Sequence, residues 1–272
     1  MFKLLRADFY RAFRFKIFYL LISGNALVGL ISVLNMYSYR MAFGVQYNAV
    51  RVLEQGMGGG FSFLGILSAI IVAIFIGHEY SSGAMRNKIM VGCGRSKIYL
   101  SKFIVSAVMC VAVYFSYHAV NFILGSVLLG WGDAVFSDVL MLFLAGLFLT
   151  LAYCGIFTFI SMLSKSTVLS LIFGILGSLA VLMAVMILLG GLQGEYIADP
   201  NDPNGAILVP CRWPAWLQWL ARAFINVMPS GQSAIISMGE GSRYGLYIAL
   251  SAVWVVLSGA GGALLFRKVD LK

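Results

Sequence analysis

Long apolar segments without charge recur six times along the chain. Each runs 23 to 30 residues without a Lys, Arg, Asp or Glu. A helix needs roughly 20 apolar residues to cross about 30 Å of hydrocarbon, and one Lys or Arg at its centre would cost roughly 2.5–3.5 kcal/mol on insertion. The pattern therefore predicts six transmembrane helices, at about residues 17–36, 61–77, 103–130, 139–163, 168–190 and 244–266.

Two other segments are not predicted to span. The glycine cluster in Gln55–Gly60 favours a loop, and the uncharged stretch 223–239 carries Asn226, Pro229 and other polar residues. Barrel strands would show alternating segments of about ten residues, which the long apolar runs do not resemble. We predict an all-α polytopic membrane protein with one transmembrane domain over residues 1–272.

Composition excludes a soluble or disordered chain. Apolar residues make up 61% of the sequence and charged residues 11%, where a soluble domain has about 25% charged residues. So little polar surface could not cover a core of this size, and so many apolar residues do not stay disordered.

The positive charge is distributed unevenly over the two sides of the predicted bundle. Of the 19 Lys and Arg residues, 14 lie on the side of the two termini and 5 lie opposite. The positive-inside rule then predicts that both termini are cytoplasmic. We read the net charge of +9 as an orientation signal facing anionic membrane lipid, and we expect no nucleic-acid partner.

The first 16 residues are predicted to form an interfacial elbow helix. Phe2, Leu5, Phe9 and Phe13 follow helical spacing, with basic residues between them. A basic topogenic segment without further role is the alternative.

The connection over residues 78–102 carries the most informative pattern. Ser81 or Ser82 can cap a helix, which would end near Gly92. Ser96 can then cap the helix that continues into the third span. A short cytoplasmic helix joined to two spans would act as a lever, whereas an ordinary loop rich in positive charge is the alternative.

Within this predicted lever, Met85 and Ile89 share one face because they are four residues apart. The polar side chains project elsewhere; they are Arg86, Asn87 and Lys88.

The fifth connection, residues 191–243, is long and predicted to lie outside. Its Asp199–Gly205 turn cluster fails the spacing of a calcium loop. An aromatic segment follows, in which Trp213, Trp216 and Phe224 are predicted to share one helical face. With Trp219, this segment predicts an outer interfacial helix, or one that dips into the membrane and returns. It could gate cargo or only anchor the chain.

Few polar groups lie inside the predicted spans. His118 and Asn121 are three residues apart on the third span, and Asn25 lies on the first. Intramembrane polar groups are candidates for a cargo pathway, although interhelical hydrogen bonding is the alternative. In the sixth span, Gly259, Gly261 and Gly262 favour close helix packing.

Motifs of catalysis and metal binding are absent from the sequence. Gly92–Lys97 lacks the spacing of a phosphate-binding loop, and His78–Glu79 is not followed by a second histidine at metalloprotease spacing. No catalytic residue, metal site or cofactor is therefore expected in this chain.

The connection over residues 78–102 resembles the signature of ABC-2 type transporter permeases, the membrane subunits of bacterial ATP-driven exporters. The matching residues are Glu79, Gly83, Arg86, Gly92, Arg95 and Lys102. The basic N-terminal segment, Pro229–Gln232 and the C-terminal Phe266–Lys272 are also similar to small Gram-positive members, including those of bacteriocin immunity and drug export.

The resemblance implies a cytoplasmic-membrane protein of a bacterium and a division of labour. Two permease subunits, identical or different, would associate with two ATP-binding subunits that hold ATP and Mg. The helix at about residues 82–91 would be the coupling helix that docks on the ATPase. The implied coupling residues are Glu79, Ser82, Gly83, Met85, Arg86, Asn87, Ile89, Arg95 and Lys102, with Met85 and Ile89 as the apolar contact.

Two other function classes stay open at this point. A stand-alone channel or carrier would normally show rings of charge or broken helices near mid-membrane. A non-transporting immunity protein would use the outer connection to sequester a peptide. The cargo cannot be read from the sequence, although the few intramembrane charges favour an amphipathic or apolar peptide, drug or lipid.

Overall fold

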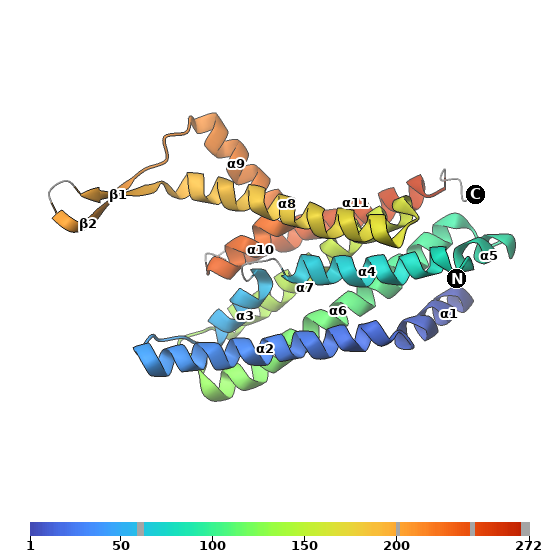
Figure 1. The fold of residues 1–272 in the computed structure, drawn as a ribbon, viewed down its shortest axis with the longest axis horizontal. Coiled ribbons are helices and arrows are strands. Elements are labelled where there is room, and N and C mark those ends of the chain that lie inside the picture. The colour runs from blue at the N-terminus through green and yellow to red at the C-terminus, as the bar shows by residue number, and fades with distance from the viewer. Residues whose placement is uncertain (59–62, 200–201, 240–242, 268–272) are drawn as a thin grey trace.

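Six long helices run side by side in the computed structural model, which describes residues 1–58, 63–199, 202–239 and 243–267 (Figure 1). Each is long and apolar enough to cross a membrane. They are α2 (Lys16–Phe43), α4 (Phe63–Ser81), α6 (Arg95–Leu128), α7 (Phe136–Ser164), α8 (Thr167–Gln193) and α11 (Tyr244–Leu265). The predicted helical class and the six spans are confirmed.

Three of these helices form the centre of the bundle and three lie at its periphery. In α4, α6 and α7, 56–61% of the apolar window is buried, against 17–22% in α2, α8 and α11. Each peripheral helix packs mainly on one central helix: α2 on α6, α8 on α4 and α11 on α7. The peripheral helices therefore leave broad apolar faces uncovered.

Two helices extend well beyond the uncharged segments that predicted them. Helix α2 continues to Phe43 and includes Arg40, whose Nη1 donates a hydrogen bond to the Leu129 carbonyl at 2.8 Å. Helix α6 begins at Arg95 and includes Lys102, which is fully buried. A Lys or Arg whose charge is paired or hydrogen-bonded can lie within a long helix, and both of these cations have such partners. The predicted start of the second span, residues 61–62, lies outside the described residues.

Helix α3 (Ala49–Gly58) corrects the prediction of a loop over Gln55–Gly60. The helix continues through residue 58, and residues 59–60 lie outside the described part of the chain. It packs against α10 and α6. Its charged residues are paired, since Arg51 lies 3.2 Å from the Glu54 carboxylate and the Tyr244 hydroxyl donates to Glu54 at 3.3 Å.

The fifth connection contains an antiparallel hairpin and two short helices. The hairpin pairs β1 (Glu195–Asp199) with β2 (Asp202–Val209), where the sequence predicted only a turn cluster. Helices α9 (Ala215–Val227) and α10 (Pro229–Met238) then run in opposite directions against the bundle (Figure 1).

Helix α10 is short but deeply buried, and the sequence did not predict it. Pro229 lies in its first turn, where a missing N–H costs nothing. Gln232 is fully buried and makes two hydrogen bonds. Its amide nitrogen donates to the Asn226 carbonyl at 2.8 Å, and its amide oxygen accepts from the Ser251 hydroxyl at 2.8 Å. Gly231 lies against the Ile225 carbonyl, so the backbone can turn sharply between α9 and α10.

The aromatic residues of the outer segment do not share one face, which corrects the prediction. The Trp213 ring lies over Gly191 of α8, and Phe224 packs with the buried Ile225. Trp216 and Trp219 face outward, with exposed fractions of 64% and 68%. Helix α9 is thus apolar on both its protein-facing and its outward face.

Only one of the three glycines predicted to allow close helix packing meets a neighbour tightly. A methyl group at Gly262 would collide with the Tyr99 hydroxyl, which donates to the Ser258 carbonyl at 2.8 Å. Gly261 has open space instead, and Gly259 has ordinary contact distance to Phe103. The close approach of α11 to α6 therefore depends on Gly262.

We expect Gly262→Ala to lower the free energy of unfolding by about 1–3 kcal/mol, because overpacking displaces Tyr99 and its hydrogen bond. Gly261→Ala is the matched control and should be neutral or slightly stabilising, since Ala is the better helix former. Thermal or denaturant unfolding of the purified protein in detergent measures both. Equal effects of the two substitutions would contradict this assignment.

Candidate functional site: a buried charge clamp

Four helices converge at the end of the bundle that carries both chain termini (Figure 1). Helix α1 (Phe2–Phe13) packs against α6, and α5 (Ala84–Met90) packs against α4. Helix α5 lies within the connection predicted to act as a lever. It is a helix as expected, but it spans seven residues rather than about ten.

The caps predicted for this connection are different in the structure. Gly83 precedes α5 with φ +70°, a left-handed conformation that favours glycine. The hydroxyls of Ser81 and Ser82 turn back to the carbonyls of His78 and Glu79, at 3.0 and 3.4 Å. These serines therefore complete the end of α4 instead of starting α5.

The same correction holds at the start of α6. Gly94 occupies the cap position without a side-chain bond. The Ser96 hydroxyl donates instead to the Ala263 carbonyl of α11 at 3.2 Å.

Two carboxylates and two ammonium groups lie together at the centre of this junction. Lys88 Nζ lies 2.6 Å from Asp8 Oδ1 and 2.7 Å from Glu79 Oε2. Lys102 Nζ lies 3.0 Å from Asp8 Oδ1 and also pairs with Glu79 Oε1. Each cation therefore bridges both anions. We call Asp8, Glu79, Lys88 and Lys102 the charge clamp.

The charge clamp is almost completely withdrawn from solvent. The side chains of Asp8 and Lys102 are 0% exposed, Glu79 is 4% exposed and Lys88 is 11% exposed. Burying a single ion has a penalty of several kcal/mol, whereas a well-bonded pair offsets much of that penalty. The two positive and two negative charges balance, so the group is stable only as a set.

Asp8 and Lys88 are the two clamp residues that lie outside the membrane-spanning helices, and their surroundings keep both of them charged. Burial opposes ionisation of Asp8, but the Lys102 charge and hydrogen bonds from Lys88 and Ser101 outweigh it and hold the pKa of Asp8 below its ordinary value. Burial likewise disfavours the charged form of Lys88, yet Glu79 and Asp8 together raise the pKa of Lys88. Both groups are therefore ionised at neutral pH.

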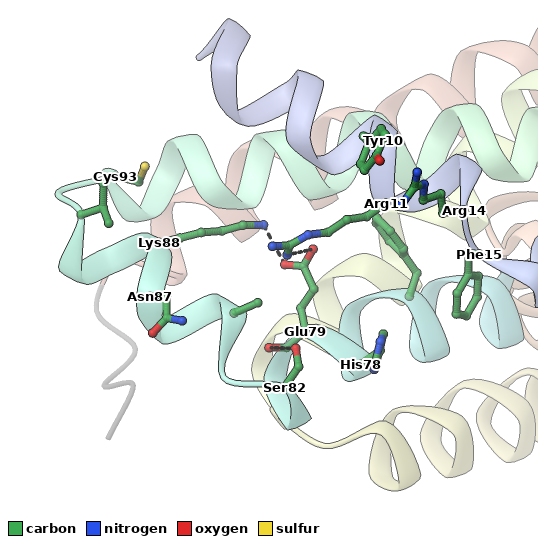
Figure 2. Close-up of a pocket in the computed structure, with 13 residues that line it drawn as sticks. Tyr10, Arg11, Arg14, Phe15, His78, Glu79, Ser82, Asn87, Lys88 and Cys93 are labelled. Carbon is green, nitrogen blue, oxygen red and sulfur yellow. Dashed lines mark hydrogen bonds and ion pairs between the residues drawn. The ribbon is translucent and has the colours of Figure 1, made fainter.

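Neighbouring side chains complete the clamp and connect it to the surface. The Ser101 hydroxyl donates to Asp8 Oδ2 at 2.7 Å, and Lys102 Nζ lies 4.6 Å from the centre of the Phe75 ring. Figure 2 shows Arg11 from α1 and Lys88 from α5 pointing toward Glu79 at the end of α4. Arg11 reaches Glu79 at 3.4 Å and remains 46% exposed. The clamp thus ties α1, α4, α5 and α6 to one another.

The structure divides the predicted coupling residues into three groups. Glu79 and Lys102 lie in the clamp. Met85, predicted as an apolar contact for the ATPase, is 2% exposed and part of the core, and Ile89 packs against the same core. A buried Met85 does not offer that contact in this structure, whereas Ile89 is only half-buried and its contact stays a prediction. Helical spacing shows which residues share a face but not which face is buried.

The remaining predicted residues lie near the surface of the junction. Arg86 and Asn87 are exposed, Ser82 is exposed and Gly83 is half-buried. Arg95 donates to the Arg267 carbonyl at 2.9 Å, which ties the start of α6 to the end of α11. Met90, absent from the predicted set, is 71% exposed.

Sequence reasoning missed Asp8, Lys88 and Ser101 as parts of one site. One signal was available, since Asp8 is the single acid among five basic residues in the first 16 positions. An acid in that position breaks the positive-inside pattern and calls for a buried partner. Its partners, however, lie 80 and 93 residues away for Lys88 and Ser101.

The predicted pathway residues lie apart from the clamp, within the spans. Asn25 donates to the Val113 carbonyl of α6 at 2.8 Å. It therefore makes the interhelical hydrogen bond that was the alternative to a role in a cargo pathway. His118 Nδ1 lies 3.0 Å from the Tyr114 carbonyl, and its ring packs against Tyr114. Asn121 is fully buried, and neither its amide oxygen nor its nitrogen has a hydrogen-bond partner among the residues described.

A cavity of about 170 Å³ lies beside Asn25, between α2, α3, α4 and α6. Its polar lining includes Ser32, Gln55 and Tyr117, and the Tyr117 hydroxyl donates to Ser32 at 3.3 Å. His118 and Asn121 do not line it. The three predicted residues therefore do not form one continuous polar surface in this conformation.

For the charge clamp, we expect Asp8→Asn to lower the free energy of unfolding by about 3–5 kcal/mol, because it leaves two buried cations facing one anion. The double variant Asp8→Asn/Lys102→Met removes one charge of each sign and should recover a large part of this loss. Arg11→Gln, at a half-exposed and longer pair, should cost less than about 1 kcal/mol. Unfolding in detergent measures all three, and a double variant no more stable than the single one would argue against charge balance.

For Asn121, we expect Asn121→Leu to leave stability unchanged or to raise it. Replacing an unsatisfied buried amide by an apolar group of similar shape removes a desolvation penalty. Asn25→Leu is the comparison. It makes the same replacement at a position where the amide donates a hydrogen bond, so it should destabilise the protein by about 1 kcal/mol. A clear loss of stability in Asn121→Leu would mean that Asn121 has a partner, such as a bound water.

Comparison with known families shows which family the chain belongs to. The profile described as ABC-2 family transporter protein matches residues 4–188, which cover α1 to most of α8 and include all four residues of the charge clamp. A comparison with curated proteins gave no match. With six apolar helices and a match over more than half of its length, the chain belongs to the ABC-2 family of transporter proteins and is a multi-pass permease of the cell membrane.

Proposed function

We propose that the chain is the permease subunit of an exporter driven by a separate ATP-binding subunit. The observation that carries the proposal is the charge clamp, which joins the short helix α5 rigidly to α1, α4 and α6. A force applied to α5 would move two central spans together. ATP and Mg would be bound by the partner, and this chain would supply no catalytic group.

The ATP-binding subunit would dock on the exposed face of α5. Arg86 and Met90 are four residues apart, so they lie on the same side of the helix. Both are exposed, whereas Met85 on the adjoining side is buried. The excess of basic residues around both termini supports a cytoplasmic position for this end of the bundle. Arg86 would give the contact its charge and Met90 its apolar anchor.

The complete exporter would contain two ATP-binding subunits and two permeases. The weakly buried α2, α8 and α11 offer apolar faces, one of which would meet the second permease, whether identical or different. The scarcity of charge inside the spans supports an amphipathic or apolar cargo, such as a peptide, drug or lipid. Transport would be directed outward.

The docking proposal predicts that Met90→Asp, alone or with Arg86→Glu, lowers co-purification of the ATP-binding subunit at least tenfold while membrane insertion stays normal. A charged group in a buried apolar contact is strongly unfavourable. Val135→Asp is the matched control, since it places the same charge at an exposed valine at the other end of the bundle. Pull-down of the tagged permease from membranes measures the effect.

Undiminished co-purification with Met90→Asp/Arg86→Glu would refute docking on this face. ATP-independent solute flux through the purified permease in liposomes would refute the proposal as a whole, because it would favour a channel or carrier.

A further inference from the structure

An open cavity of about 710 Å³ lies between α1, α4 and α5, beside the charge clamp. Its volume is within the roughly 300–1,000 Å³ typical of ligand sites. The lining comes from the second half of α1, the last turns of α4 and one side of α5 (Figure 2). On α5 this side consists of Ala84, Asn87 and Lys88, with Val91 following, so it differs from both the core face and the proposed docking face.

The cavity carries an excess of positive charge. The four charges of the clamp cancel, whereas Arg11 and Arg14 add two further cations to the lining. Arg11 has only a long contact to Glu79, at 3.4 Å. The Arg14 guanidinium lies 4.4 Å from the centre of the Tyr10 ring, and among the described residues it forms no ion pair. Both guanidinium groups can therefore still bind an anion.

The cavity lining also combines polar and apolar side chains. Asn87, Lys88 and Cys93 lie at one side of it, and Phe15 lies at the other side beside Arg14 (Figure 2). Phe15 directly precedes α2, and Phe75 lies within α4, so both aromatic rings belong to the start of the membrane-spanning region. A ligand that fits this lining has an anionic polar head and an apolar tail.

We propose that this cavity binds one anionic phospholipid of the adjacent leaflet, with the phosphate on Arg11 and Arg14 and the acyl chains beside Phe15 and Phe75. A guanidinium pairs with phosphate through two parallel hydrogen bonds, and anionic lipids are concentrated in the cytoplasmic leaflet. The bound lipid would hold the elbow helix α1 against α5. This site does not depend on the ATP-binding subunit.

The test uses the full-length protein in neutral detergent with equal amounts of phosphatidylglycerol and phosphatidylcholine of the same acyl chains. Native mass spectrometry counts the lipids retained. The wild type should retain one phosphatidylglycerol in preference to phosphatidylcholine. Arg14→Gln should weaken this binding roughly fivefold, and Arg11→Gln/Arg14→Gln roughly 25-fold, as expected for loss of one or two cations near an anionic lipid.

Lys3→Gln/Arg6→Gln is the matched control. It removes two exposed cations from the same helix that do not line the cavity, and it should retain the lipid as the wild type does. Arg14 has no part in the clamp, so Arg14→Gln keeps the test valid if the double variant is unstable. This variant should also co-purify the ATP-binding subunit normally, which separates the lipid site from the docking proposal.

Three results would overturn the lipid site. They are equal retention of the two lipids, an equal loss in the Lys3→Gln/Arg6→Gln control, and displacement of phosphatidylglycerol by an equal concentration of inorganic phosphate. The last result would identify a site for free anions rather than for lipid.

Discussion

The pairing of two buried lysines with two buried carboxylates is the constraint on which this end of the molecule depends. None of the four charges could be buried alone, because the penalty for a lone ion is several kcal/mol. Asp8, Glu79, Lys88 and Lys102 come from four helices and satisfy one another only when all four are in place. The short helix α5 is thereby joined to α1 and α4 through Lys88.

The opposite end of the bundle is built by different means. There α3 and α10 enter between the long helices, and side-chain hydrogen bonds join both to α11, from Ser251 to Gln232 of α10 and from Tyr244 to Glu54 of α3. Small residues also let the helices approach closely, as Gly262 does beside Tyr99. Motion of α5 would therefore pass along α4 and α6 toward the end that contains α3 and α10.

Much of this architecture could be predicted from the sequence, and the failures have a common physical cause. The six spans could be predicted because a charge in hydrocarbon is costly. The ends of two of these helices could not be predicted, because Arg40 and Lys102 have partners that allow them to lie within a helix. Helices α3 and α10 were missed since ten-residue helices with polar residues do not look like spans. Pairings across 80 or more residues, such as Asp8 with Lys88, leave no local pattern.

Helix α5 illustrates why the face of a helix matters more than its position. Met85 and Ile89 face the core, Arg86 and Met90 face outward, and Asn87 and Lys88 face the cavity under α1. The seven residues of α5 thus present three different faces, because residues three and four positions apart share a face. In the proposed exporter the ATP-binding subunit and the anionic lipid would occupy different faces of one rigid lever, so the bilayer could support α1 without competing with the partner that drives transport.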